Sequence, residues 1–197
     1  MRIPSLKNLS FGLAIVSMVS MGVASAQSLV GVNAKLDRTL DSKSAAAGQA
    51  VTAKLDGTIT ADGTKLPKGT ELIGKVADVK NTDGAVSVSV VFTSARLKDG
   101  KQVPVKATLL AAYPALDPVS ESLGDAGALP PPAQVSPDDK FNQEPGALAH
   151  VTLTSAVKDP ASGTFSSTGG NFKLMAGTNL QLGVAPSSAG SGVNAAE

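Results

Sequence analysis

The feature that most constrains this chain is a two-residue rhythm of apolar side chains from Leu29 to Ala112. Between Val51 and Ile59, for example, valine, alanine, leucine and isoleucine alternate with threonine, lysine and aspartate. Such alternation puts every second side chain on one face of a β-strand, so that one face is buried and the other is solvated. The same rhythm predicts further strands at 30–36, 72–79, 86–92 and 103–109.

Short turn sequences separate these segments. Asp-Gly pairs stand at 62–63, 83–84 and 99–100, and Pro67-Lys68-Gly69 joins two of the predicted strands. Proline presets φ at the first turn position, and glycine adopts the positive φ that a tight turn needs. Strands at such short spacing predict an antiparallel meander. The expected fold class is therefore all-β, as a small antiparallel β-barrel or sandwich.

Three positions should interrupt this regularity. After Phe92 the apolar residues move to the other register, at Ala95 and Leu97, which predicts a bulge or a bend around a barrel corner. Pro104 lacks a backbone donor, which predicts a sheet edge or a strand start. Gly74 has no side chain, so a neighbouring backbone can approach it closely.

The composition changes after Ala112. Residues 113–146 hold seven of the 12 prolines, and six acidic residues stand there against Lys140 alone. Few apolar side chains and a net negative charge cannot offset the entropy of ordering. The segment is therefore predicted to be a flexible Pro-rich acidic insertion.

Strand patterns return at 151–157, 172–174 and 180–184, and these last strands should close the first sheet. Residues 186–197 are rich in serine, glycine and alanine, which predicts a disordered tail. These boundaries predict one β domain over 27–185. Two small β units joined by a proline-rich linker are the alternative.

Residues 1–26 have the form of a secretory signal peptide. Arg2 and Lys7 precede an apolar run that ends in Ala24-Ser25-Ala26, and cleavage is expected after Ala26. The mature protein would then be periplasmic in a bacterium, or secreted. An uncleaved membrane anchor is the alternative. No later segment has the roughly 20 apolar residues of a spanning helix, so no stable membrane span is expected after cleavage.

Composition argues against several classes of function. The chain has no Cys, no Trp, one Tyr and one His, and its formal net charge is +1. Without thiolates it has neither disulfides nor thiolate metal sites. A near-neutral chain with few aromatic rings is a poor binder of nucleic acid. We therefore predict no cofactor, no metal and no nucleic-acid partner.

The single histidine, His150, allows a Ser/His/Asp arrangement to be drawn with Ser155 and Asp159. Residues five apart on one strand point to opposite faces, however, and the nucleophile-elbow pattern Gly-x-Ser-x-Gly is absent. We interpret His150 as a surface or strand-edge residue, and we predict no catalytic residue.

Two further patterns approach ligand-binding motifs and fail on spacing. The glycines of residues 163–170 are spaced as in a phosphate loop, but the lysine, the hydroxyl residue and the helix that should follow are missing. This stretch is predicted to be a flexible hairpin loop. Asp138, Asp139 and Glu144 lack the oxygen-rich spacing of a calcium loop, which predicts a solvated acidic loop.

Four stretches carry a resemblance to a known family. LPKGTELIGKV, LKDGKQVPV and KLMAGTNLQLGV, at 66–76, 97–105 and 173–184, are similar to the β-barrel region of TrbI-type conjugation and secretion-channel proteins. LDSKSAAAGQAVTAKL, at 40–55, resembles short exported bacterial proteins of unknown function that share the same turns. The resemblance implies a small periplasmic barrel that assembles into larger envelope structures. Such similarity specifies fold better than function.

Three functions remain open from the sequence. The preferred one is an exported, non-enzymatic β-barrel that acts as an envelope interaction or assembly module, through the insertion or through strand edges that a partner strand extends. A cell-envelope hydrolase would use carboxylates such as Asp56, Glu71, Asp78 or Asp99. The third is a self-associating component of a surface or secretion-channel layer.

Overall fold

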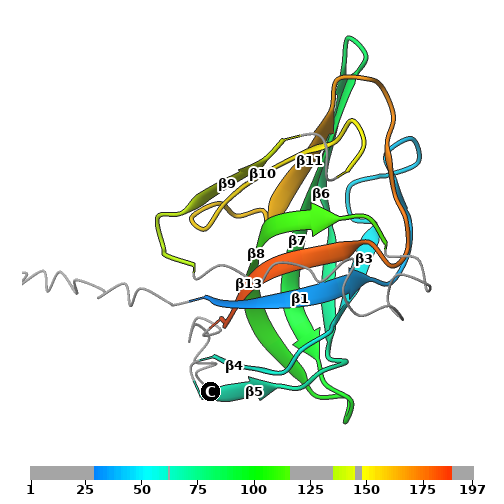
Figure 1. Ribbon diagram of the computed structural model, residues 1–197. Coiled ribbons are helices and arrows are strands. Elements are labelled where there is room, and N and C mark those ends of the chain that lie inside the picture. The colour runs from blue at the N-terminus through cyan, green and yellow to red at the C-terminus, as the bar shows by residue number, and fades with distance from the viewer. Residues whose placement is uncertain (1–28, 62, 116–134, 145–147, 188–197) are drawn as a thin grey trace, which may run out of the picture.

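The computed structural model describes residues 29–61, 63–115, 135–144 and 148–187, and all regular structure in these parts is β. Six strands form the main body (Figure 1). They are β1 (Val30–Leu36), β3 (Ala50–Leu55), β6 (Glu71–Thr82), β7 (Ala85–Arg96), β8 (Gln102–Tyr113) and β13 (Asn179–Pro186). The predicted all-β class is confirmed.

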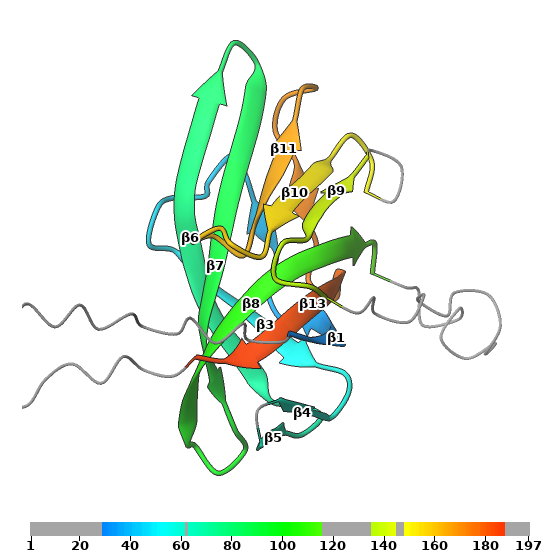
Figure 2. The same ribbon diagram turned by 90° about the vertical axis from the view of Figure 1, so that its left-hand side faces the viewer.

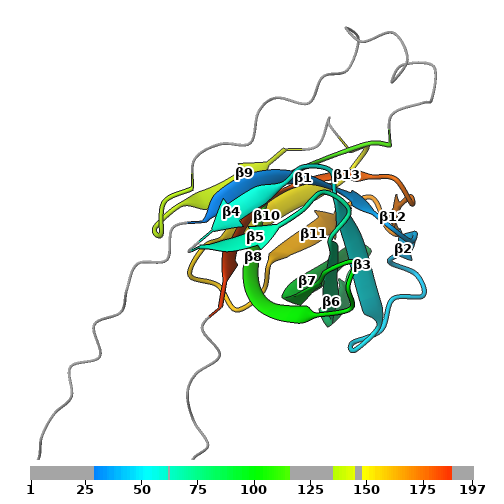
Figure 3. The same ribbon diagram turned by 90° about the horizontal axis from the view of Figure 1, so that it is seen from below.

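The six strands close into an antiparallel barrel. The strands β1, β3, β6, β7 and β8 pair in chain order, which is the predicted meander. The last strand, β13, pairs with both β8 and β1 and so closes the ring, as expected for the 180–184 pattern. Seen from below, the six strands surround a common interior (Figure 3).

A second group of strands extends this sheet from β7. It consists of β11 (Gly163–Ser167), β10 (Thr152–Ala156) and β9 (Lys140–Gln143), in that order outward. Two small two-stranded sheets complete the fold. They pair β2 (Leu40–Asp41) with β12 (Lys173–Leu174), and β4 (Ile59–Ala61) with β5 (Thr64–Leu66). The strand predicted at 172–174 therefore pairs with β2, and the barrel is closed by β13 alone.

The buried apolar residues form two clusters. The barrel interior is filled by the inward residues of the six strands together with Phe165 and Leu153 from β11 and β10. A smaller cluster lies outside the barrel wall, between β8, β13 and the β9–β10 layer. Its buried members are Leu29, Leu110, Val135, Val157 and Ala185, and Phe141 packs against them.

The predicted irregularities are present. Thr93 is an extra residue in β7, since Phe92 pairs with Gly74 whereas Ser94 pairs with Ile73. This bulge lets Phe92 and Ala95 both point inward, at 2% and 0% exposure. A Cβ built on Gly74 would lie 2.3 Å from the Val91 carbonyl oxygen, which is the close backbone approach expected there. Pro104 is the third residue of β8, near the strand start.

The second half of the chain corrects two expectations. Residues 135–144 of the predicted insertion are structured, because Val135 and Phe141 join the outer cluster and β9 pairs with β10. Residues 163–170 begin with the strand β11 and are not a hairpin loop. Alternate residues of β11, Gly163, Phe165 and Ser167, are buried.

Residues 116–134 and 145–146 of the insertion lie outside the described residues, as do residues 1–28, 62, 147 and 188–197. The predicted signal peptide and most of the predicted tail therefore belong to the undescribed part of the chain. Pro186, the first residue of that predicted tail, belongs to β13 and pairs with Val105. Within the described residues, no helix has the length and apolar character to cross a membrane.

Candidate functional site

The hairpin of β6 and β7 projects beyond the other barrel strands (Figure 2). We call its outer part, residues 78–89, the arm. Asp83 and Gly84 form its tip with φ values of 50° and 82°. Positive φ at both central residues is characteristic of the type I′ turn, which matches the twist of the two flanking strands. The turn predicted at Asp83-Gly84 is confirmed.

One edge of the arm has no neighbouring strand among the described residues. On that side β3 pairs with β6 only as far as Ala50 and Lys75. The last backbone contacts are made by Val76, which donates to the Gln49 carbonyl and accepts from the Gly48 amide, both at 2.8 Å. Residues 78–82 pair with β7 alone. We call the side of residues 78–82 that faces away from β7 the open edge.

The side chains of the open edge are divided between two faces. Asp78 and Lys80 stand opposite Ser89 and Ser87 on the solvent face, and their carboxylate oxygen and ammonium nitrogen are 3.4 Å apart. Val79 stands opposite the buried Val88 and packs against the barrel core while remaining partly exposed. The open edge is therefore polar on one face, and on the other it carries Val79 beside the exposed Asn81, which stands opposite Val86.

Sequence reasoning missed this edge. The predicted strand stopped at Val79 because Lys80, Asn81 and Thr82 are all polar and show no alternation. A signal was nevertheless present. A two-residue Asp-Gly turn requires its strands to continue up to it on both sides, so the turn at 83–84 already implied a strand through Thr82.

The opposite end of the extended sheet, β9, is a second edge. It is four residues long and includes an exposed lysine, Lys140, features that resist addition of a further strand and that the short, charged open edge shares. Its Gln143 side chain also reaches the barrel, where it accepts from the Ala112 amide at 2.7 Å and donates to the Ala112 carbonyl at 2.9 Å.

Ser162 holds the barrel together where β7 and β8 separate. These two strands pair only between 94–96 and 102–104. Beyond this short paired region, Ser162 bridges the two strands. On the β7 side its amide donates to the Val90 carbonyl at 2.8 Å and its hydroxyl accepts from the Phe92 amide at 2.9 Å. On the β8 side its carbonyl accepts from the Leu109 amide at 2.7 Å. Ser162 is 1% exposed, so the two strands are bridged at this point by buried hydrogen bonds.

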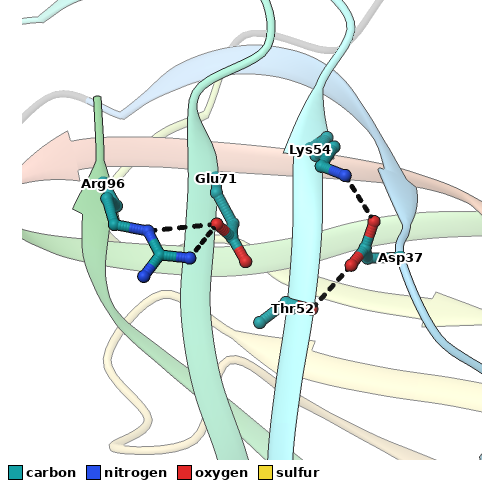
Figure 4. Close-up of polar contacts among 5 residues, drawn as sticks. All are labelled: Asp37, Thr52, Lys54, Glu71 and Arg96. Atoms are coloured by element: carbon teal, nitrogen blue, oxygen red, sulfur yellow. Dashed lines mark hydrogen bonds and ion pairs between the residues drawn. The ribbon is translucent and has the colours of Figure 1, made fainter. Parts of the chain in front are cut away.

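A row of alternating charges crosses the outer barrel wall (Figure 4). Arg96 on β7 donates to Glu71 on β6 at 2.5 and 3.2 Å, Glu71 stands opposite Lys54 on β3, and Lys54 donates to Asp37 at 2.7 Å. The hydrogen bond from Lys54 lowers the pKa of Asp37 below its usual 3.8, against the opposing effect of burial. The same bond raises the pKa of Lys54. All four charges have partners, which favours a stabilising role for this row.

Replacing Asp37 with asparagine should lower the free energy of unfolding at pH 7 by less than about 1 kcal/mol, because the ion pair is largely exposed. A lowered pKa means that the contribution of Asp37 is present above the unfolded-state value of 3.8 and is lost as pH falls through the folded-state value. Urea unfolding at pH 7 and pH 2.5 tests this. A deficit of equal size at both pH values would contradict it.

The four carboxylates considered for hydrolysis do not converge. Glu71 pairs with Arg96, Asp56 with Lys68 at 2.8 Å and Asp78 with Lys80 at 3.4 Å. Asp99 accepts from the Lys101 amide in its turn. Each carboxylate has its own local partner. The paired acids that glycoside hydrolysis requires are therefore not assembled from these residues.

The drawn Ser/His/Asp arrangement is also not assembled. His150 is exposed in a turn with φ of 60°, two residues before β10 begins. The buried Ser155 hydroxyl donates to the Leu109 carbonyl of β8. Asp159 is exposed beyond the end of β10. A hollow of about 460 Å³ on the β9–β11 layer has Asp159 as its one acidic lining residue.

The acidic loop residues have structural partners as well. Asp139 accepts from the Ser136 amide at 2.7 Å, Asp138 pairs with Lys158, and Glu144 accepts from Asn142 at 3.0 Å. Across the described residues, no three histidine or acidic side chains are grouped so that they could hold a metal ion.

Similarity to known proteins was found in structure and not in sequence. No protein-family model matches this chain, and no curated protein matches it. Among solved structures it is similar to ComB10 of the Com type IV secretion system of Helicobacter pylori. The TM-score is 0.39 with 13% sequence identity, over 80% of this chain and 85% of that chain.

Proposed function

We propose that this protein is a non-enzymatic interaction or assembly module of the bacterial envelope, and that it binds a protein partner by strand addition at the open edge. Export through the signal sequence expected at residues 1–26 would deliver it to the periplasm or outside the cell. The observation that supports this function is the open edge at residues 78–82, where β6 pairs with β7 alone among the described residues.

The open edge has what strand addition needs. A partner strand gains main-chain hydrogen bonds from the unpaired backbone and gains specificity from pockets for alternate side chains. Residues 78–82 contain no proline that would block such bonds. The type I′ turn and the pairing with β7 hold the arm in extended form, so that little ordering is needed when a partner binds.

Two other functions were considered from the sequence, a cell-envelope hydrolase and a self-associating component of a surface or secretion-channel layer. The hydrolase has no support from the positions of its carboxylates, each of which has a separate local partner. A contact role for the acidic insertion stays a prediction, since residues 116–134 lie outside the described part of the chain. Self-association is compatible with strand addition, because an unpaired edge can pair with the same edge of a second copy.

Photo-crosslinking in living bacteria tests the proposed function. A photo-reactive benzoylphenylalanine placed at Lys80 should give a discrete protein adduct. The matched control is Lys65, which is also an exposed lysine within a hairpin strand, β5, and it should give none. Adducts of equal yield from both positions, or none from Lys80, would contradict a partner at the open edge.

A further inference from the structure

The open edge carries a short sequence that is complementary to itself. Residues 78–80 read Asp-Val-Lys, with a negative and a positive side chain flanking a central valine. When two identical strands pair antiparallel about a two-fold axis, the numbers of opposite residues add to a constant. With the axis through Val79, Asp78 of each copy stands opposite Lys80 of the other.

We propose that the partner at the open edge is a second copy of this chain, joined through an isologous antiparallel pairing centred on Val79. This inference rests on the proposed function and names its partner. The extended sheets of the two copies, each running from β6 through β7, β11 and β10 to β9, would form one continuous sheet across the two-fold axis.

The charges favour this register over the two centred on its neighbours, Asp78 and Lys80. Asp78 and Lys80 share the solvent face of the arm, so the pairing centred on Val79 brings two acidic and two basic groups together in alternation. An axis through Lys80 would set two lysines directly opposite each other, and an axis through Asp78 would set two aspartates opposite. Like charges in directly opposite positions destabilise a strand pair. Only the Val79 axis avoids them among these three registers.

The face that carries Val79 agrees with the same register. Val79 lies on the side of the arm that packs against the barrel core, and it is partly exposed at the open edge. The two-fold axis places the Val79 side chains of the two copies against each other on that face. Their contact would extend the buried apolar layer across the interface, which is the favourable term in most protein association.

Charge reversal tests the pairing in the purified full-length protein. Asp78→Lys gives an arm with two lysines, and Lys80→Asp gives an arm with two aspartates. Each variant alone should lose self-association by at least tenfold in sedimentation equilibrium, because every opposite pair becomes a like pair. An equimolar mixture should restore a one-to-one dimer. Failure of the mixture to associate, or unimpaired association of either single variant, would overturn the proposal.

A cysteine at the axis provides a second readout that does not depend on affinity. Directly opposite residues in an antiparallel pair have Cα atoms about 4.5–5.5 Å apart, which a disulfide can span. The natural chain has no cysteine, so Val79→Cys should oxidise to a single disulfide-linked dimer. Lys65→Cys, an exposed control in β5, should stay monomeric. A monomeric Val79→Cys protein, or equal dimer yield from both, would overturn the proposal.

The two levels of inference can fail separately. If the second copy is the partner, the adduct formed from Lys80 in cells has twice the mass of the chain and contains this protein alone. An adduct with a different protein, together with a purified chain that stays monomeric, would overturn the self-pairing and leave the open edge as an interaction site. Absence of any adduct from Lys80, with Val79→Cys also monomeric, would reject both.

Discussion

Replacing Gly74 with alanine should lower the free energy of unfolding by about 3 kcal/mol, at the upper end of what overpacking a core usually costs. A Cβ at this position would lie 2.3 Å from the Val91 carbonyl oxygen and 3.0 Å from the Phe92 Cα. Both atoms belong to the backbone of β7, which cannot move aside as a flexible side chain can. The β6–β7 pairing would have to separate or the Thr93 bulge to shift.

Gly57 supplies the control for this substitution. A Cβ there would meet Val32 Cγ2 at 3.7 Å, an ordinary contact, and Gly57 does not need a positive φ. Gly57→Ala should therefore change stability by less than about 0.5 kcal/mol. Urea unfolding followed by circular dichroism measures both variants. Similar stability of the Gly74 and Gly57 variants would show that β7 does not approach β6 as closely as the structure has it.

The parts of the fold that were predictable are those with local signals. The meander followed from alternation and from Asp-Gly turns, and each predicted strand at 30–36, 72–79, 86–92 and 103–109 lies within an observed one. The bulge at Thr93 was visible because Phe92 and Ala95 are apolar in different registers. The role of Gly74 followed from its lack of a side chain in the middle of a strand.

The β9–β11 layer was harder to predict because its signals are weak or dispersed. In β11 the buried positions are Gly163, Phe165 and Ser167, so that only one of three inward residues is a large apolar one. β9 is a short strand beside many prolines and acids, and it is held by an outer cluster whose members Leu29, Leu110 and Val135 are far apart in sequence. Alternation within one segment cannot reveal a core that is assembled in this way.

The candidate site was unpredictable for a different reason. Its residues Asp78, Val79 and Lys80 are ordinary members of a strand, and Asp78 was considered only as a possible catalytic acid. What distinguishes them is that β3 pairs no further than Lys75 while β6 continues to Thr82. The length of one strand relative to its neighbour is a property of the assembled sheet. The resemblance to TrbI-type barrels, which indicated the fold, contains no information about it.

Replacing Phe165 with alanine should have the largest effect of any single change considered for this protein, a loss of about 3–5 kcal/mol in the free energy of unfolding. Phe165 is 2% exposed and is the largest of the fully buried side chains. It stands between Leu153 of β10 and Val88 of β7 in the register of the sheet. Its removal would leave a cavity where the outer layer joins the barrel.

The next residue in the strand, Ser166, is the control because it is half-buried on the opposite face and stands opposite Thr152 and Ser87. Ser166→Ala should lower the free energy of unfolding by less than about 0.5 kcal/mol.

Hydrogen exchange in the Phe165→Ala variant shows whether the β9–β11 layer unfolds together with the barrel or on its own. If β11 is an integral part of the sheet, Phe165→Ala will speed exchange in β6 and β7 as well as in β10, because one cooperative unit has lost stability. Faster exchange confined to β9–β11, with the barrel strands unchanged, would show that the outer layer unfolds on its own. The arm would then be a two-stranded hairpin without support from β11, too weak to act as a rigid docking edge.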